Sequence, residues 1–133
     1  MKKIIVILSA VVVLGLMSFR LTRQMDPWVV PDKYNKMPNP VKSDAESIAA
    51  GKEIWAKQCQ SCHGKSGKGD GPKAAQLKTL PHDISKPDVQ SQTDGALFYK
   101  TSEGREDMPS FKKKIPDQDD IWSVVNYIRT FKK

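Results

Sequence analysis

The sequence has few cysteine and histidine side chains and no segment with the pattern of a β-strand. Its 133 residues include two cysteines and two histidines. A structural zinc site takes four ligands, and beyond the segment that holds both cysteines only His82 offers a ring nitrogen. A zinc site is therefore disfavoured. Because no stretch alternates convincingly between apolar and polar residues, we expect a chain made of helices and loops.

The excess of positive over negative charge is also small outside the N-terminus. The net charge is +7, but four of the basic residues lie before residue 24, where no acidic residue occurs. The rest of the chain has 18 basic and 15 acidic residues, a net charge of +3. These basic residues are scattered and have no stacking aromatics between them, so we expect no nucleic-acid partner.

The first 23 residues are a predicted signal peptide or membrane anchor. Two lysines precede an apolar run from Ile4 to Phe19, which is the pattern of an export segment. As a helix this run would span roughly 24 Å, short of the ~30 Å hydrocarbon core, so cleavage and retention both stay open. In a bacterium, either outcome places the remainder on the outer, periplasmic face of the cytoplasmic membrane. A lipid anchor is excluded because neither cysteine lies near the end of the run.

Residues 24–42 are a predicted proline-rich linker, and residues 43–133 a single domain. Four prolines and two asparagines disfavour helix in the linker. Its Trp28 could pack on the domain or rest at a lipid interface, and we favour packing on the domain. The domain is small enough for a bound cofactor to supply part of its stability.

Helix signals recur along the domain, as capping residues followed by apolar residues at helical spacing. They indicate an all-α domain with long loops, and no pattern places residues 81–92. The expected helices run from a capping box at Ser43–Glu46 to about Gln58, from Pro72 to about Leu77, from Asp94 to about Ser102, and from the cap Asp117 to the end of the chain.

The strongest chemical signal is the segment Cys59-Gln60-Ser61-Cys62-His63. Two thiols at this spacing can each add to one vinyl group of haem, and the adjacent histidine can ligate the iron. A thioredoxin-like redox pair, a structural disulfide and half of a zinc site are the competing interpretations. A redox pair needs a strand before the first cysteine, whereas this motif ends a predicted helix. We therefore predict covalent haem attachment through Cys59 and Cys62, with His63 as an iron ligand.

A second iron ligand is expected from the other side of the ring, and Met108 is the best candidate. It lies ahead of Pro109 in a charged loop between the last two predicted helices, where a methionine that only fills the core is less expected. His82 is the rival, although a lone histidine in a proline-containing loop is more often exposed or hydrogen-bonded. Met25 and Met37 are weaker alternatives.

Together these residues resemble the class I (mitochondrial-type) monohaem cytochrome c family, in its small bacterial branch, from about Ala45 to Phe131. Gly51 and Trp55 are similar to the glycine and aromatic pair of the family's N-terminal helix. The Gly69–Pro72 segment is similar to the loop whose proline carbonyl accepts a hydrogen bond from the ligating histidine, which implies that Pro72 orients that ring. The resemblance implies a compact cytochrome c fold of about four to five helices with long loops around one haem, preceded by the apolar segment.

The predicted ligation indicates a function. An iron with both axial positions filled by protein has no open site for oxygen or substrate, so we expect single-electron transfer and no enzymatic activity. The expected partners are membrane-bound respiratory or photosynthetic complexes, including a terminal reductase or oxidase, and Lys112–Lys114 could steer an acidic partner. A retained N-terminal segment would add contact with the membrane. Two alternatives stay open, a haem-bearing subunit of a larger oxidoreductase complex and a small haem peroxidase.

Overall fold

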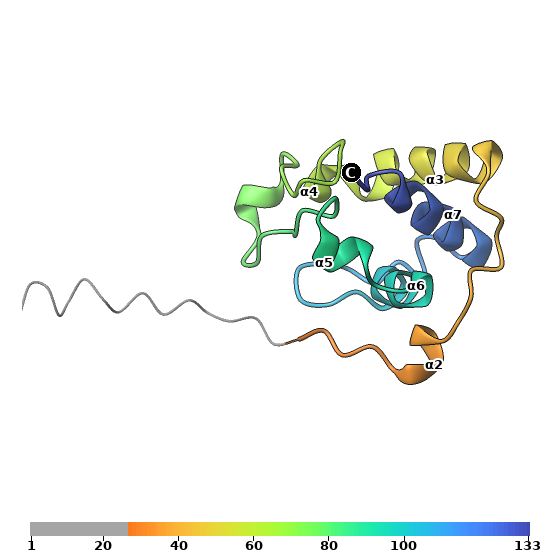
Figure 1. The fold of residues 1–133 in the computed structure, drawn as a ribbon. Coiled ribbons are helices and arrows are strands. Elements are labelled where there is room, and N and C mark those ends of the chain that lie inside the picture. Colours follow the sequence, from red (N-terminus) through yellow and green to blue (C-terminus); the bar gives the residue numbers. More distant parts are fainter. Residues whose placement is uncertain (1–26) are drawn as a thin grey trace, which may run out of the picture.

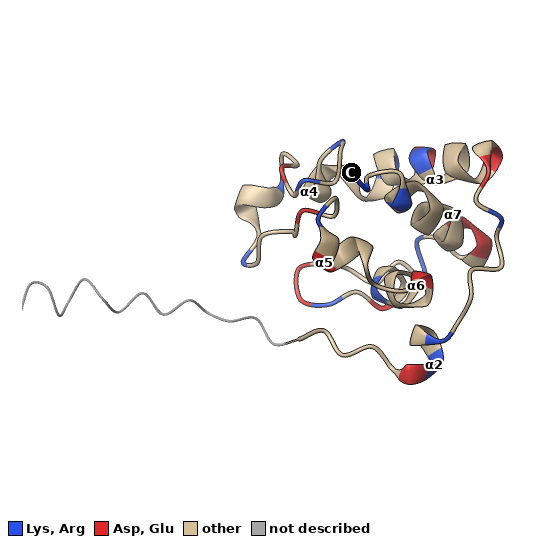
Figure 2. Ribbon diagram, in the orientation of Figure 1, with Lys and Arg blue, Asp and Glu red and all other residues tan. Residues whose placement is uncertain are grey.

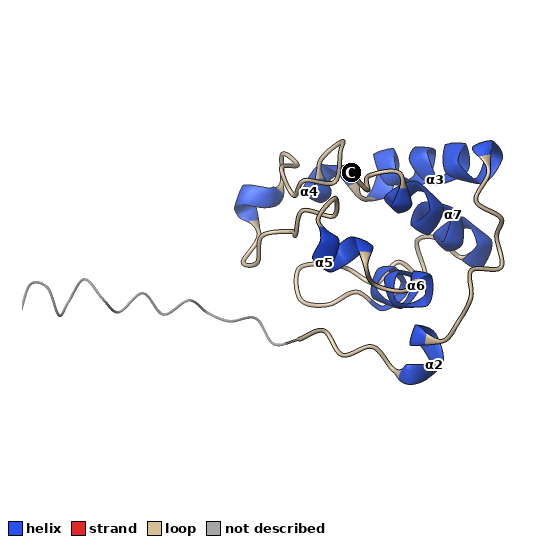
Figure 3. Ribbon diagram, viewed as in Figure 1, coloured by secondary structure: helices blue, strands red, loops and turns tan. Residues whose placement is uncertain are grey.

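The computed structural model describes residues 27–133, and the regular structure in that range is helical except for one isolated β-bridge between Arg105 and Met108 (Figure 3). The predicted all-α class is therefore confirmed. The three longest helices match predicted ones, and the helix expected from Pro72 is a 3-10 turn. In chain order the elements are α2 (Asp32–Asn35), α3 (Ala45–Gln58), α4 (Gln60–His63), the 3-10 turn η1 (Ala74–Gln76), α5 (Pro87–Gln90), α6 (Asp94–Glu103) and α7 (Gln118–Arg129).

Three single-turn helices, α2, α4 and α5, are not predicted from the sequence. We expected residues 24–42 to lack helix, and this expectation is wrong for Asp32–Asn35. The helix α2 begins directly after Pro31, and α5 has Pro87 in its first turn. The fixed backbone angle of proline suits the start of a helix, so the same residues that disfavour a long helix here begin a short one.

The start of α3 corrects a second detail. Asp44 caps this helix, whereas the predicted capping box began at Ser43. The Asp44 carboxylate accepts a hydrogen bond from the backbone N–H of Ser47 at 3.1 Å, and the Ser47 hydroxyl accepts one from the Asp44 N–H at 3.2 Å. The Ser47 hydroxyl also donates to the Lys42 carbonyl at 2.7 Å and accepts from Asn126 of α7 at 3.1 Å. These tertiary contacts select the cap, which local sequence alone leaves open.

Helices α3 and α7 pack side by side and make the most extensive helix contact of the fold (Figure 1). Gly51 lies where they cross, and a Cβ atom added to it would lie 2.0 Å from the carbonyl oxygen of Ser123 in α7. One turn later, Trp55 is 2% exposed, and its ring packs against those of Tyr127 and Phe131 at centroid distances of 6.0 and 5.1 Å. The two residues that the sequence singled out in this helix therefore form its contact with α7.

A substitution at this crossing should destabilise the fold. Because the added methyl group of Gly51→Ala meets a backbone carbonyl that cannot move aside, we expect the free energy of unfolding to fall by about 2 kcal/mol, despite the better helix propensity of alanine. Denaturant unfolding of the haem-loaded protein measures this change. Lys52→Ala, on the exposed side of α3, is the control and should change stability by less than ~0.5 kcal/mol. Equal stability of the two variants would contradict the prediction.

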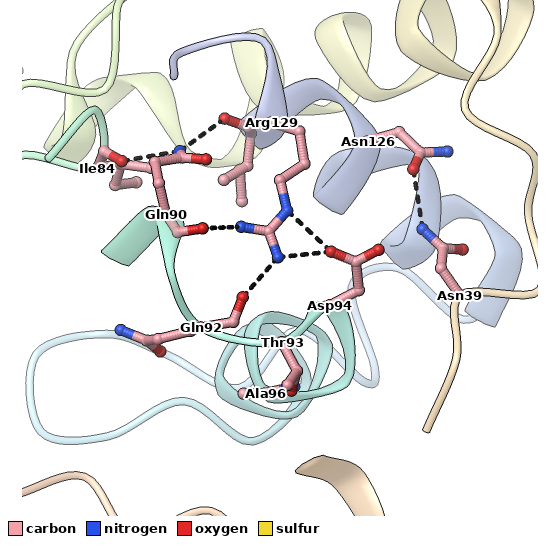
Figure 4. Close-up of polar contacts among 10 residues, drawn as sticks. Asn39, Ile84, Gln90, Gln92, Thr93, Asp94, Ala96, Asn126 and Arg129 are labelled. Carbon is pink, nitrogen blue, oxygen red and sulfur yellow. Dashed lines mark hydrogen bonds and ion pairs between the residues drawn. The ribbon is translucent and has the colours of Figure 1, made fainter. Parts of the chain in front are cut away.

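The Arg129 side chain joins the end of α7 to the segment between α5 and α6 (Figure 4). Its guanidinium donates to the backbone carbonyls of Gln90 and Gln92 at 2.9 and 2.7 Å, and its Nε donates to the Asp94 carboxylate at 2.8 Å. The buried amide of Gln90 donates in turn to the Ile84 carbonyl at 2.9 Å. A segment whose course the sequence does not predict is thereby fixed by several charge-assisted hydrogen bonds.

Residues 27–42, which we call the N-terminal strap, lie against the domain. Tyr34 in α2 packs on Tyr99 in α6 with ring centroids 4.7 Å apart, and Gly95 leaves room for the strap, since a Cβ there would lie 1.9 Å from the Tyr34 carbonyl oxygen. The side chain of Asn39 donates to that of Asn126 at 2.8 Å (Figure 4). The predicted signal or anchor at residues 1–23 lies outside the described residues. Within residues 27–133, no helix has the length and apolar character needed to cross a membrane.

Candidate functional site

The two cysteines and the adjacent histidine follow directly on α3. Cys59 is the C-cap of α3, and its N–H donates to the Trp55 carbonyl at 2.9 Å. The single turn α4 then follows, in which the N–H of His63 donates to the Cys59 carbonyl at 3.0 Å. Gly64 ends this turn with a φ of 79°, a conformation that glycine adopts without strain. A helix rather than a strand therefore leads into the motif, unlike the arrangement of a thioredoxin-like redox pair.

The thiol chemistry disfavours the other interpretations of the motif. Both cysteines are free, and burial, with a smaller effect of Cys62, raises the pKa of the Cys59 thiol to about 12. A redox-active cysteine needs a lowered pKa, because the thiolate is the nucleophile. Among residues 27–133, no group of three or more histidine, cysteine or acidic side chains could hold a metal ion by itself. Neither a redox pair nor a zinc site is supported by these surroundings.

The motif opens into a cavity of about 720 Å³. This volume falls within the roughly 300–1,000 Å³ of small-molecule and cofactor sites. Cys59, Cys62, His63 and Met108 all line it, although they come from two distant parts of the chain. The remaining wall is largely apolar and includes the core residues Trp55, Ile84, Leu97, Phe111, Val124 and Ile128. An apolar cavity with two thiols and two soft or nitrogenous ligands at its wall fits a covalently bound haem.

His63 has the state that a metal ligand needs. Burial lowers the pKa of its imidazole, and the neutral ring is the form that binds a metal ion. Its Nδ1 is buried and has no hydrogen-bond partner within the described residues. A buried polar atom without a partner is uncommon and calls for an explanation. The imidazole lies in the cavity wall beside the two thiols. This position and the unpaired nitrogen are both consistent with a group bound at the ring.

The Gly69–Pro72 loop lies against the motif, but the predicted role of Pro72 stays a prediction. The N–H groups of Gly71 and Lys73, on either side of this proline, donate to the carbonyls of Cys62 and Ser61 at 3.1 and 2.8 Å. Pro72 itself is exposed, and the structure places no hydrogen bond between it and the His63 ring. The backbone groups on either side of Pro72 thus hold the loop beside the histidine.

Met108 lies in a tight turn that is fixed by two hydrogen bonds from Thr79, a residue distant in sequence. The N–H of Met108 donates to the Arg105 carbonyl at 3.0 Å, and its carbonyl accepts from the Arg105 N–H at 2.8 Å. Glu106, between these two residues, has a φ of 54°, which is unusual for a residue with a side chain. The backbone N–H of Thr79 donates to the Asp107 carboxylate at 3.0 Å, and its hydroxyl donates to that of Glu106 at 3.1 Å. The turn is thereby attached to the opposite loop of the cavity.

The rival ligands have different surroundings. His82 also lines the cavity, but its side chain is 64% exposed and lies 4.0 Å from the Asp88 carboxylate. Met37 packs against the core but does not line the cavity, and Met25 lies outside the described residues. Trp28 packs on the domain, as expected from the sequence, and it also lines the cavity, which was not predicted. Its only signal was a large aromatic residue within an otherwise proline-rich segment.

Comparisons with known proteins support a cytochrome c family for the chain. A family model described as cytochrome c oxidase, cbb3-type, subunit III matches residues 46–128. Cytochrome c6 of Cladophora glomerata is 35% identical over 86 residues, which cover 64% of this chain and 89% of that protein.

Two solved structures share the fold at 24% identity. A chain of the Kuenenia stuttgartiensis reducing HAO-like protein complex aligns with a TM-score of 0.63 over 84% of this chain and 53% of that one, so this chain spans about half of its length. The KustC0563 c-type cytochrome aligns with a TM-score of 0.55 over 62% of this chain and 98% of that one.

The resemblance inferred from the motif, the helix crossing and the methionine loop is thus confirmed by these comparisons. Covalently bound haem c and its iron follow from membership of the family, and two cysteines are present to attach it. The chain belongs to the family described as cytochrome c oxidase, cbb3-type, subunit III, within the class I monohaem cytochromes c, and it is an electron-carrying haem c protein.

Proposed function

We propose that the chain carries single electrons between membrane-bound respiratory or photosynthetic complexes on the outer face of the cytoplasmic membrane, without catalysis at its iron. One observation carries the proposal. A single cavity is lined by both cysteines and by the two side chains, His63 and Met108, that can fill the axial positions of an iron. An iron ligated on both sides by protein has no vacancy for a substrate, which leaves electron exchange as its function.

In this proposal each site residue has a separate task. Cys59 and Cys62 form thioether bonds to the ring, and His63 and Met108 ligate the iron. When bound, the haem supplies reversible one-electron chemistry. The apolar wall excludes water, which disfavours the additional charge of the ferric state and favours a high reduction potential. The turn that contains Met108 keeps the thioether sulfur at the wall, because Thr79 holds it from the facing loop.

The surface around the cavity supports docking of another protein. Leu80 lines the cavity and is 67% exposed, and Lys114 lines it from the loop after Met108. Of the three lysines that could steer an acidic partner, Lys112 already pairs with the Glu103 carboxylate, which leaves Lys113 and Lys114 for that role. Figure 2 shows acidic and basic positions interspersed along the described chain, so steering would depend on this local group rather than on a charged face.

A haem-bearing subunit of a larger oxidoreductase is the second candidate. The description of the matching family names an oxidase subunit, and one solved relative is part of a protein complex. As a subunit the chain would pass electrons within an assembly instead of diffusing between partners. Residues 1–23, as an anchor or a cleaved signal, are part of both proposals.

Optical spectra of the haem-loaded full chain test the proposal. We expect haem that resists acid extraction, a low-spin spectrum in both oxidation states, and a weak near-infrared band from methionine ligation in the ferric state. A high-spin ferric spectrum would contradict it and favour the peroxidase alternative. Solubilising the native membranes and purifying the chain separates the two roles. Stoichiometric copurification of other subunits indicates a complex, and a chain that purifies alone indicates a carrier.

A further inference from the structure

We propose that Trp28 is part of the haem site, where it covers the cofactor and, through Arg105, holds the Met108 turn in place. The inference rests on the proposed function, since it assumes that Met108 ligates the iron. Trp28 lies outside residues 46–128, the range that the family model matches. The family comparison therefore assigns no role to this residue, and the N-terminal strap that carries it is a separate addition to the cavity.

The indole of Trp28 lies beside two cations, Lys100 and Arg105, which line the same cavity. The side chain is half-buried and lines the cavity. The guanidinium carbon of Arg105 lies 4.8 Å from the centroid of its ring, and the Nζ of Lys100 lies 5.4 Å from it. Both distances are within the range of cation–π attraction, for which tryptophan is the best aromatic partner. Lys100 is itself oriented by donating to the Gln92 side chain at 2.7 Å.

The strap reaches this position because it is docked farther along the chain. Tyr34 packs on Tyr99, the backbone of α2 lies against Gly95, and Asn39 bonds Asn126. These contacts order the strap up to the edge of the cavity, so that only a short stretch separates the docked α2 from Trp28. The entropy lost in placing the indole over the cavity is correspondingly small.

Arg105 connects the indole to the predicted axial ligand. Its backbone N–H donates to the Met108 carbonyl at 2.8 Å, and its carbonyl accepts from the Met108 N–H at 3.0 Å. A guanidinium held over Trp28 therefore restrains the first residue of the turn, while Thr79 restrains its middle. Losing the indole should loosen the turn at one end and admit water to one side of the cavity.

Both effects can be measured on the haem-loaded full chain with imidazole as an external ligand. Imidazole displaces a methionine from ferric iron only when the methionine dissociates, so its apparent affinity reports how firmly the turn holds Met108. Because the cation–π contact that restrains Arg105 is lost, we expect Trp28→Ala to bind imidazole about tenfold more tightly than the unsubstituted protein. The reduction potential should also fall, since water stabilises the ferric state.

Val29→Ala is the matched control, because Val29 is adjacent in sequence, 79% exposed and does not line the cavity. It should leave the imidazole affinity and the potential unchanged. Trp28→Phe keeps an aromatic face but binds cations more weakly, so an intermediate affinity is expected. If Trp28→Ala loads no haem, the phenylalanine variant decides the matter by the same two measurements.

The outcomes separate the inference from the function on which it rests. Unchanged imidazole affinity and potential in both Trp28 variants, with a normal methionine band in the unsubstituted protein, would overturn the inference and leave the proposed function standing. An unsubstituted protein that lacks the methionine band would overturn the proposed ligation, and the inference with it.

Discussion

Replacing Cys59 and Cys62 together with serine should abolish covalent haem attachment. Serine hydroxyls do not add to vinyl groups under the conditions in which thiols do, so no thioether forms. Acid extraction of the purified protein, followed by haem detection on the protein and in the extract, measures the loss. We expect retention of haem on the polypeptide to fall from nearly all to none. Haem that stays bound after extraction would contradict the assignment of these two thiols.

The same variant should lose its cooperative fold. The domain surrounds a cavity of about 720 Å³ whose walls are core residues of α3, α6 and α7, and a domain of this size has little apolar core to spare. Without covalent haem we expect a denaturant transition that is broad or absent. Ser61→Ala is the control, because Ser61 lies between the two cysteines and, among the described residues, its hydroxyl makes only a long contact, 3.8 Å, with the Cys62 sulfur. That variant should keep both its haem and its cooperative transition.

The parts of this protein that could be predicted from its sequence are those that short spacings determine. The Cys59–His63 motif carries its chemistry within five consecutive residues. The long helices can be predicted from their caps and from apolar residues at helical spacing. Asp117, for example, caps α7 by accepting a hydrogen bond from the Asp119 N–H. Local signals of this kind need no knowledge of the rest of the fold.

The parts that were missed depend on contacts between distant residues. The cap of α3 moved by one residue because Ser47 also bonds Lys42 and Asn126. The course of the chain from α5 to α6 is set by Arg129, whose contacts no sequence pattern predicted. A side chain that satisfies several backbone carbonyls far away in sequence leaves no periodic pattern to detect.

The same distinction holds within the site. Met108 could be selected as a candidate ligand from its loop. The hydrogen bonds from Thr79 that hold its turn, however, connect Thr79 to Glu106 and Asp107, which are 27 and 28 positions away in sequence. Trp28 belongs to a segment that composition alone describes as a linker. Its place at the cavity depends on α2 docking against α6. Sequence therefore selected the groups that we propose bind the cofactor and left open the groups that position them.

Met108→Ala should convert the low-spin ferric iron to a high-spin or water-ligated state and remove the near-infrared methionine band. The thioether favours ferrous iron, so its loss should lower the reduction potential by on the order of a few tenths of a volt, within the span of about 0.8 V that axial ligands cover. Spectroscopy of the ferric protein and a redox titration measure both effects. Covalent haem should be retained, since Cys59 and Cys62 are untouched.

Two further variants make this result specific to Met108. Met37 packs against the core without lining the cavity, so Met37→Ala should lower stability and keep the band. His82→Ala removes the rival ligand, whose side chain is 64% exposed, and should also keep the band. The opposite pattern, with the ferric spectrum unchanged in Met108→Ala and altered in His82→Ala, would assign the iron to His82. Because the backbone N–H and the hydroxyl of Thr79 donate to the Asp107 and Glu106 carboxylates and not to the methionine side chain, the turn should stay in place in Met108→Ala. The spectral change then reports the lost thioether itself rather than a displaced loop.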